Sequence, residues 1–300
     1  MPDNKQGVIK KQQLTTDEVR EIRELMNICN AYEGLDLKLS PKEGSTGSGN
    51  EINDFFYYRN GKLIGFLALD RFGSQDREVA GMVHPDYRRK GIFRTLLMAA
   101  KEECTQRGIS RLILISEAAS PAGKAFAEAM GASYDFSEYR MELAEVRQQR
   151  VGVGALVAAR LARERIQLQK ANAKDIGVLA HITAAAFGST EERVQEHILT
   201  DLREPNCQFY IGKLGEKPVG CFKLYENEKE VGIYGFGVLP EYQGKGYGRQ
   251  MLEQIISQIR VQGQKRITLE VDIDNTNAVG LYRSCGFKEV TTYGYYTLNI

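Results

Sequence analysis

The C-terminal half of the chain alternates short apolar runs with segments of helical period. Residues 166–171 read as a strand, and apolar residues recur at helical spacing over 173–188. A second helix is predicted over 189–204, where Ser189 or Thr190 can cap the first turn. The further predicted elements are strands over 208–214, 218–226 and 230–239, a helix over 247–263, a strand over 266–273, a helix over 275–286 and two closing strands.

The N-terminal half repeats this order, so internal repetition is the main feature of the sequence. Its predicted elements are a helix over 15–34, strands over 54–59, 62–70 and 78–84, a helix over 92–108, a strand over 111–116, a helix over 122–131 and strand candidates within 133–143. Residues 144–165 fit neither copy. The pattern predicts two α/β domains of similar topology, at 1–145 and 166–300, with a connector at 146–165.

Composition narrows the function classes. The chain has 300 residues, with 40 Lys and Arg against 39 Asp and Glu, so its net charge gives no broad electrostatic case for binding nucleic acid or a membrane surface. The five cysteines are scattered without C-x-x-C spacing, which argues against a disulfide framework or a zinc site. No apolar run approaches the roughly 20 residues of a membrane span, and the N-terminus lacks a secretory apolar core. We expect a cytoplasmic protein without a metal.

A glycine-rich loop, 243-QGKGYG-248, lies between a predicted strand and a predicted helix. Phosphate groups need several donors at once, and backbone N–H groups at a helix N-terminus are free to supply them. Glycine lets those amides turn toward an anion without a Cβ in the way. The loop lacks both the G-K-[ST] ending of a Walker motif and the G-x-G-x-x-G fingerprint of dinucleotide sites. The alternative interpretation is a plain glycine-rich turn.

Two segments carry a family resemblance. The first, 238-VLPEYQGKGYG-248, resembles the acetyl-coenzyme A loop of the GNAT superfamily of N-acyltransferases. The second, 275-NTNAVGLYRSCGF-287, resembles the later N-x-x-A-x-x-L-Y-x-x-x-G-F motif of the same superfamily. The resemblance covers 166–300 closely and 10–143 more loosely. It implies two tandem GNAT-like domains, each a mixed, mostly antiparallel twisted sheet flanked by helices.

The resemblance also implies a cofactor site for acetyl-coenzyme A. Its pyrophosphate would be held by the loop residues Gln243, Gly244, Lys245, Gly246, Tyr247, Gly248 and Arg249. The strand ending at Val238 would pair with the pantetheine arm and splay from its neighbour, and the Val238 N–H would polarise the thioester carbonyl. Asn275 would bind near the arm. Gly235 and Gly237 agree with a distorted strand.

Tyr282 stands where many members of the family have the general acid that protonates the departing thiolate. A packed tyrosine in an amphipathic helix is the alternative. Glu230 is the one candidate for a general base, although the charged stretch 226–230 also fits a hairpin tip. His181 and His197 lack a partner motif, and Cys221 and Cys285 are expected to be packing residues.

The N-terminal copy keeps part of the loop. Val83 precedes 88-RRKGIF-93, so Arg88, Arg89, Lys90 and Gly91 preserve its charge and its middle glycine. A second coenzyme A site there stays open. Ser120, Ala127 and Phe93 take the places of Asn275, Tyr282 and the last loop glycine. The proton donor is therefore missing, and this half is expected to be a degenerate partner, as in known tandem members with one working half.

The expected function is an N-acetyltransferase that moves an acetyl group from acetyl-coenzyme A to a primary amine of a small molecule or peptide. The alternative is a non-catalytic protein that binds or senses acyl-coenzyme A. An aminoacyl transferase that draws on aminoacyl-tRNA is a third hypothesis, against which the good coenzyme A loop and the lack of basic excess both count. In a strand over 293–298, Tyr293 and Tyr295 would face one side and Tyr296 the other. One of these faces is expected in the core, and the other either in the core or in an acceptor pocket. The acceptor and a homodimer are left open.

Overall fold

The computed structural model describes residues 5–41, 43–45, 51–71, 76–144, 165–263 and 265–300. Contacts divide it into two compact units. Unit 1 comprises Met1–Glu138 and Thr291–Ile300, and unit 2 comprises Tyr139–Val290. Apart from Arg165, the predicted connector at 146–165 lies outside the described residues.

Unit 1 has its strands in the hydrogen-bonded order β1-β4-β5-β6-β7-β14-β8. Its elements are β1 (Gly7–Lys11), β2 (Gln13–Leu14), α1 (Thr16–Glu33), β3 (Gly44–Ser45), β4 (Asp54–Arg59), β5 (Lys62–Arg71), β6 (Asp76–Val83), the 3₁₀ turn η1 (Pro85–Tyr87), α2 (Ile92–Gln106), β7 (Arg111–Glu117) and α3 (Pro121–Ala129), with parts of β8 (Ser133–Leu143) and β14 (Phe287–Asn299).

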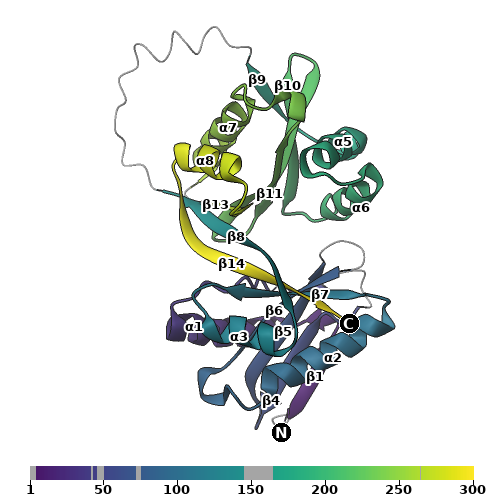
Figure 1. Ribbon diagram of the computed structural model, residues 1–300, viewed down its shortest axis with the longest axis vertical. Coiled ribbons are helices and arrows are strands. Elements are labelled where there is room, and N and C mark those ends of the chain that lie inside the picture. The colour runs from purple at the N-terminus through teal and green to yellow at the C-terminus, as the bar shows by residue number, and fades with distance from the viewer. Residues whose placement is uncertain (1–4, 42, 46–50, 72–75, 145–164, 264) are drawn as a thin grey trace. The chain divides into compact units, whose positions relative to one another are not determined.

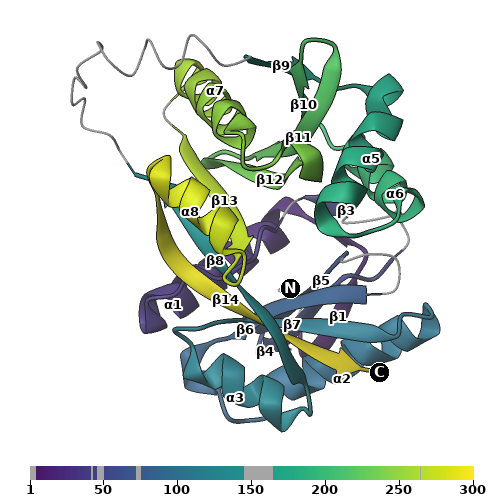
Figure 2. The ribbon, with the colours of Figure 1, turned by 45° about the horizontal axis from the view of Figure 1, so that its top comes forward.

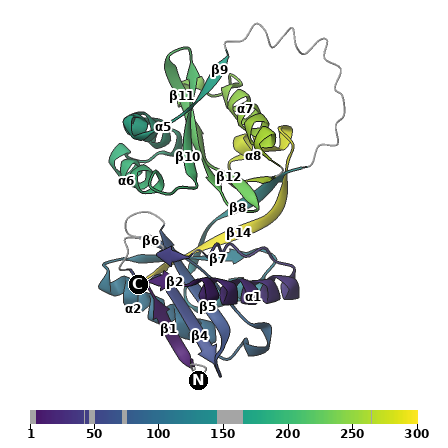
Figure 3. The ribbon, with the colours of Figure 1, turned by 180° about the vertical axis from the view of Figure 1, so that it is seen from behind.

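Helices cover both faces of the unit 1 strands. Helix α1 buries Ile22 and Leu25 against β4, β5 and β6, and α2 and α3 pack on the opposite face (Figures 1 and 3). Helix α1 begins at a capping box, in which the Thr15 hydroxyl accepts from the Glu18 N–H and the Glu18 carboxylate accepts from the Thr15 N–H. This box explains why the helix starts at Thr16.

Unit 2 repeats the plan, with the strand order β14-β8-β13-β12-β11-β10-β9. Its elements are β9 (Ile166–Lys170), η2 (Ala173–Asp175), α5 (Ile176–Phe187), α6 (Glu191–Asp201), β10 (Cys207–Leu214), β11 (Lys217–Glu226), β12 (Glu230–Val238), η3 (Pro240–Tyr242), α7 (Tyr247–Gln262), β13 (Arg266–Asp272) and α8 (Thr276–Ser284). Helices α7 and α8 cover one face and α5 and α6 the other (Figure 1). Helix α8 lies beside β13 (Figure 2).

Two long strands belong to both units. Strand β8 begins in unit 1 and ends in unit 2, whereas β14 begins in unit 2 and ends in unit 1. The end of β14 pairs antiparallel with β7, from Tyr293↔Glu117 to Asn299↔Arg111. The units therefore differ from the sequence-based division at 1–145 and 166–300, because each half of the sequence gives the end of its last strand to the other unit.

The tyrosines of 293–298 show how β14 is held. Tyr293 and Tyr295 face one side, are 2% and 1% exposed, and pack with Ile113. Tyr296 faces the other side and joins the α2 and α3 core. The Tyr293 hydroxyl donates to the Asp36 carbonyl at 2.7 Å, and the Lys38 ammonium donates to the Tyr295 hydroxyl at 2.7 Å. Both faces of this strand segment are thus core in unit 1.

The prediction of two α/β domains of similar topology is confirmed. The sequence missed β1, which pairs with β4 from Gly7↔Tyr58 to Lys11↔Asp54. It also divided the closing segment into two strands, where the structure has one. None of the helices in the described part of the chain has the length and apolar content that a membrane span requires.

We expect removal of residues 291–300 to damage unit 1 selectively. Ending the chain at Val290 deletes every register pair between β14 and β7 and three buried tyrosines. The amides of β7 should then exchange with solvent at least about tenfold faster, because local opening no longer breaks those contacts. Hydrogen exchange read by mass spectrometry measures this.

A chain that starts at Gln12 is the control, because it loses the edge strand β1 and keeps the β14–β7 pairing. Equal protection of β7 in the two truncated chains would contradict the exchange of strand ends.

Candidate active site

Strand β12 separates from its parallel neighbour part-way along its length. Its ladder with β13 runs from Glu230↔Arg266 to Ile233↔Leu269, whereas β12 continues to Val238 and β13 to Asp272. On the other side, β12 pairs with β11 as far as Val238↔Gly220, with a register shift opposite Phe222. The strands β12 and β13 therefore splay, and the last residues of β12 are bonded on one side by β11.

The register shift is a β-bulge. Lys223 pairs with Tyr234 and Cys221 pairs with Gly237, so Phe222 faces the two residues Gly235 and Phe236. Gly235 has φ +57°, which a residue with a side chain adopts only at a cost. The strand glycines that the sequence linked to distortion thus include the bulge itself.

The glycine loop connects β12 to α7. Gly244 and Gly246 have φ +71° and +83°, and Gly246 is the N-cap of α7 without a side-chain cap. The Gln243 side-chain amide donates to the Val238 carbonyl at 2.9 Å, which ties the loop to the end of β12. The first-turn N–H groups of α7, at Tyr247 and the residues after it, lack partners within the helix. Such a helix start favours an anion.

The charged loop side chains have different surroundings. Lys245 is exposed, and its ammonium lies 5.5 Å from the centroid of the Tyr242 ring. Arg249 donates to the Ser284 hydroxyl at 2.6 Å and to the Ser284 carbonyl at 3.5 Å, so it links α7 to the C-terminal end of α8. The positive charge of Arg249 also suits that helix end.

Asn275 is the N-cap of α8. Its side-chain oxygen accepts from the Ala278 N–H at 3.1 Å. In unit 1, the Ser120 hydroxyl accepts from the Gly123 N–H at 3.3 Å and caps α3 in the same way. The polar residue that opens this motif therefore has a folding role in both units. A contact of Asn275 with the cofactor arm stays a prediction.

Tyr282 lies on α8 at the splay. It is 5% exposed, and its ring makes edge contacts with the Phe236 ring, at 6.2 Å between centroids, and with the Phe287 ring, at 6.1 Å. Burial raises the pKa of the Tyr282 hydroxyl above its ordinary value, with a smaller contribution from Cys285. The phenol therefore keeps its proton at neutral pH.

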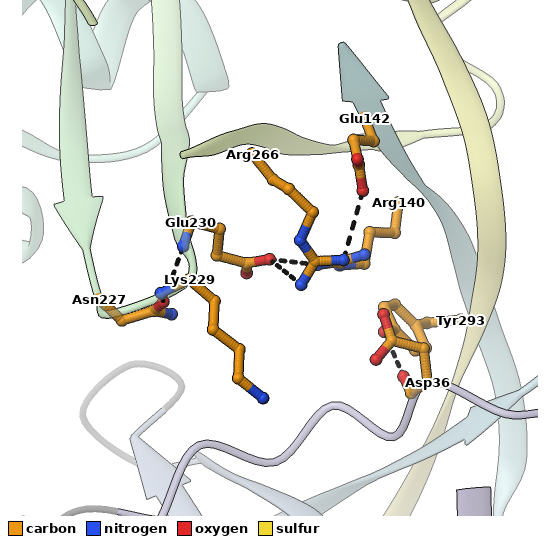
Figure 4. A network of polar contacts seen from close by, with 8 residues as sticks. All are labelled: Asp36, Arg140, Glu142, Asn227, Lys229, Glu230, Arg266 and Tyr293. Carbon is orange, nitrogen blue, oxygen red and sulfur yellow. Dashed lines mark hydrogen bonds and ion pairs between the residues drawn. The ribbon is translucent and has the colours of Figure 1, made fainter. Parts of the chain in front are cut away.

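Glu230 lies at the start of β12 (Figure 4), whereas Val238 is the last residue of that strand. Its carboxylate accepts from Arg140 at 2.7 Å and from Arg266 at 3.1 Å, and Arg266 also contacts Glu142 at 3.4 Å. The Glu230 N–H donates to the Asn227 side chain at 2.9 Å. These contacts tie β8, β12 and β13 together. A role of Glu230 as general base stays a prediction.

The two cysteines and His181 do not form a nucleophile–base pair with one another. Burial raises the pKa of the Cys221 thiol to about 11, and Thr183 lies 3.4 Å from its sulfur. Burial also raises the pKa of Cys285. His181 is exposed and lies 2.8 Å from Glu191. The two thiols are mainly protonated at neutral pH, which suits packing residues.

Comparison with known proteins decides the family. The model described as "Acetyltransferase (GNAT) family" matches residues 19–132 and 177–287, one stretch in each half of the sequence. The chain belongs to the GNAT family of acetyltransferases. It is a GNAT-type N-acetyltransferase, as the two sequence motifs predicted. Proteins of this family use acetyl-coenzyme A as the acyl donor.

Two relatives and one solved structure show different degrees of likeness to this GNAT protein. A mycothiol acetyltransferase of Clavibacter sepedonicus is 25% identical over 230 residues, which cover 74% of this chain and 73% of the relative. A [ribosomal protein bS18]-alanine N-acetyltransferase of Escherichia coli is 39% identical over 62 residues, 21% of this chain and 42% of that relative. A tandem GNAT protein from the clavulanic acid biosynthesis pathway has a TM-score of 0.70 at 16% identity, covering 97% of this chain and 98% of that one. The last likeness supports the tandem fold.

Unit 1 keeps the backbone of the GNAT loop. Arg89 and Gly91 have φ +63° and +77°, close to Gly244 and Gly246, and Gly91 is the N-cap of α2. Arg88 donates to the Val83 carbonyl at 3.1 Å, the same contact that Gln243 makes with Val238. Arg88 also pairs with Glu33 at 2.8 Å. Lys90 lies 5.2 Å from the Tyr87 ring centroid, as Lys245 lies beside Tyr242.

The side chains around the unit 1 loop differ. Strand β6 pairs with β5 in regular register through Leu67↔Gly81, without the shift seen in β12. Its ladder with β7 ends at Val79↔Leu114, so this pair of strands also separates. Phe93 packs on the Phe126 ring at 5.0 Å, and a Cβ at Gly81 would lie 2.7 Å from Phe93. An aromatic ring from α2 therefore fills space beside β6.

Sequence reasoning missed one residue of the unit 2 site, Phe236. It lies between Gly235 and Gly237, and both glycines were interpreted as signs of distortion. A large aromatic residue between two such glycines was the available signal. A Cβ at Gly237 would lie 2.8 Å from the Ala186 Cβ. Position 237 therefore needs glycine because α5 packs closely against it.

Replacing Gly244 by Ala should destabilise the protein by about 1 kcal/mol, because the new Cβ meets open space and the left-handed backbone is the whole cost. Gly248→Ala is the matched control. Its Cβ would meet Leu281, Val238 and Phe236 at ordinary contact distances of 3.5–3.7 Å, and Ala favours the first turn of α7. Urea unfolding of both variants checks this. Equal losses would show that backbone φ does not account for the glycine at 244.

Glu230→Gln should lower the free energy of unfolding by about 2 kcal/mol, because two arginines lose a charged acceptor and the Arg140 side chain is only 9% exposed. Glu228→Gln, an exposed residue of the same hairpin, is the control and should change it by less than about 0.5 kcal/mol. Chemical denaturation measures both. Loss of acetyl transfer at unchanged stability in Glu230→Gln would favour the general base instead.

Proposed function

We propose that unit 2 transfers an acetyl group from acetyl-coenzyme A to a primary amine by direct attack within a ternary complex. The observation that supports this proposal is that one unit contains a glycine-rich helix start, a splayed strand and a buried, protonated phenol. The loop meets the end of β12 through Gln243 and Val238, and the bulge residue Phe236 contacts Tyr282.

Different groups of unit 2 bind different parts of acetyl-coenzyme A. Backbone amides from Gln243 to Arg249 hold the pyrophosphate at the start of α7, where the helix dipole favours negative charge. Beyond Ile233 the edge of β12 that leaves β13 is free of that ladder, so the pantetheine arm pairs there as an added strand. The Val238 N–H polarises the thioester carbonyl, and Asn275 lies near the arm.

The chemistry needs one proton donor. The amine nitrogen bonds to the carbonyl carbon, the carbon–sulfur bond breaks with its electron pair on sulfur, and the Tyr282 hydroxyl gives that sulfur a proton. The proton lost by the amine passes to solvent, from which the phenolate is then reprotonated. Holding the amine and the thioester together supplies much of the rate, because attack becomes intramolecular.

The acceptor is a primary amine of a small molecule or peptide. This class is supported by the names of two relatives, one a mycothiol acetyltransferase and one a [ribosomal protein bS18]-alanine N-acetyltransferase. The match to the first spans both units, whereas the match to the second is local, which favours a small molecule. A cytoplasmic location stays a prediction, and a homodimer and a second coenzyme A site at Val83, Arg88, Arg89, Lys90 and Gly91 stay open.

The test is release of thiol from acetyl-coenzyme A in the presence of spermidine, glucosamine, free amino acids and an alanyl peptide. We expect at least one amine to be acetylated, and Tyr282→Phe to lower the rate about 100-fold while coenzyme A still binds. Burial raises the pKa of Tyr282 above its ordinary value near 10. At every pH below 10, we therefore expect no decrease of the wild-type rate that is caused by loss of the Tyr282 proton.

Full activity in Tyr282→Phe would remove the tyrosine from the mechanism. Tight binding of coenzyme A without any turnover would instead favour the non-catalytic sensing function. Isothermal titration calorimetry with coenzyme A separates these two outcomes.

A further inference from the structure

Five aromatic side chains of unit 2 form a continuous row, which we call the aromatic row. Successive ring centroids are 5.2, 5.5, 6.2 and 6.1 Å apart, the first two pairs stacked and the last two edge-to-face. Its members come from β10, β11, β12, α8 and β14, and they are Tyr210, Phe222, Phe236, Tyr282 and Phe287. The row ends at Tyr282 and the Phe287 ring that supports it.

Phe236 belongs to the row because of the bulge. Along a regular strand, side chains alternate between the two faces. Ile233 faces the core under α7 and α8, so Phe236 would otherwise point toward α5. The extra residue at Gly235 reverses this order, so that Phe236 and Val238 pack on the α7 and α8 core. Gly237 then faces Ala186 of α5.

The Phe236–Tyr282 contact lies where the sheet has lost its hydrogen bonds. The β12–β13 ladder ends at Ile233↔Leu269, so beyond it no β-ladder between these strands fixes β12 relative to α8, which packs on β13. The Phe236 ring reaches Tyr282 across this interval. Together with the Phe287 ring, Phe236 gives the phenol ring two edge contacts. A proton donor must be held within hydrogen-bond reach of its target, so this constraint bears on transfer.

Unit 1 shows that the fold does not need the row. By position along the repeated elements, the row corresponds there to Phe55, Leu67, Gly81, Ala127 and Ala132. Unit 1 therefore lacks the bulge, the ring at Phe236 and the phenol together, and it still forms a buried core under α2 and α3. Unit 1 lacks both the ring that corresponds to Phe236 and the proton donor that corresponds to Tyr282. Their joint absence indicates that the ring of Phe236 supports Tyr282.

We propose that Phe236 is a positioning residue that acts through Tyr282: the bulge turns its ring to the phenol and fixes the hydroxyl for proton transfer. This inference rests on the proposed role of Tyr282. It assigns the ring of Phe236 no contact with the acyl donor or the amine.

The test is a double-mutant cycle in the full chain, using the amine of the panel with the fastest thiol release and single-turnover rates. Phe236→Leu should lower the transfer rate about tenfold, from the loss of an edge contact, and leave the KM for acetyl-coenzyme A within about twofold. Phe236→Tyr keeps the ring and should restore most of the rate. In the Tyr282→Phe background, Phe236→Leu should change the rate by less than about twofold.

Phe126→Leu is the matched control, because it breaks the Phe93–Phe126 aromatic pair of unit 1 and should leave the rate unchanged. Additive effects of Phe236→Leu and Tyr282→Phe would overturn the inference. Full activity of Tyr282→Phe, or no turnover at all, would instead count against the proposed function.

A second measurement does not need turnover. In a chain labelled with ¹³C-tyrosine, NMR measures the ring-flip rate of Tyr282. The resonance that is missing from the spectrum of Tyr282→Phe identifies this residue. Faster flipping by at least about tenfold in Phe236→Leu supports the positioning role, because the ring loses a packed neighbour. An unchanged flip rate overturns it.

Discussion

The site of unit 2 depends on where one row of backbone hydrogen bonds stops. If β12 stayed bonded to β13 up to Val238, both strand edges would be occupied and no ligand could pair with the end of β12. Ending the ladder at Ile233 costs several strand hydrogen bonds, each of which contributes about 1 kcal/mol. The bulge, the tie between Gln243 and Val238, and the ring contact of Phe236 are what hold the separated strand in place.

A comparison of the two units separates the backbone geometry that both share from the side chains that only unit 2 has. Both units have splayed central strands, a 3₁₀ turn and a loop with two residues of positive φ before a helix. In unit 1, one of those residues is Arg89, so the geometry is kept even where glycine is not. The phenol and its aromatic neighbours distinguish unit 2. A shared fold therefore says little about activity, which is decided by a few side chains.

Much of the fold was open to prediction because it repeats. Apolar period, caps and turns located most helices and strands in both halves, and the loop 243–248 pointed to the site. The exchange of β8 and β14 was not predictable, because a strand's apolar alternation is the same whichever sheet it joins. Strand β1 was missed since 7-GVIKK-11 is short and half polar.

The chemistry of single residues was less predictable than the motifs. The phenol at 282 stands out in the sequence through its motif, but its aromatic support depends on a register shift, which moves Phe236 to the other face. Glu230 illustrates the reverse case. Its place before the glycine loop suggested a base, and only the structure shows Arg140, distant in sequence, beside it. Long-range ion pairs leave no local pattern.

The shared strands also bear on how the chain matures on the ribosome. Synthesis proceeds from the N-terminus, and domains generally fold as they emerge. Unit 2 receives its borrowed segment, the end of β8, early, because it is made before β9. Unit 1 must wait for Thr291–Ile300, which are made after the whole of unit 2. The half that is made first is thus completed after the other half, and its β7 edge stays open until β14 has been made.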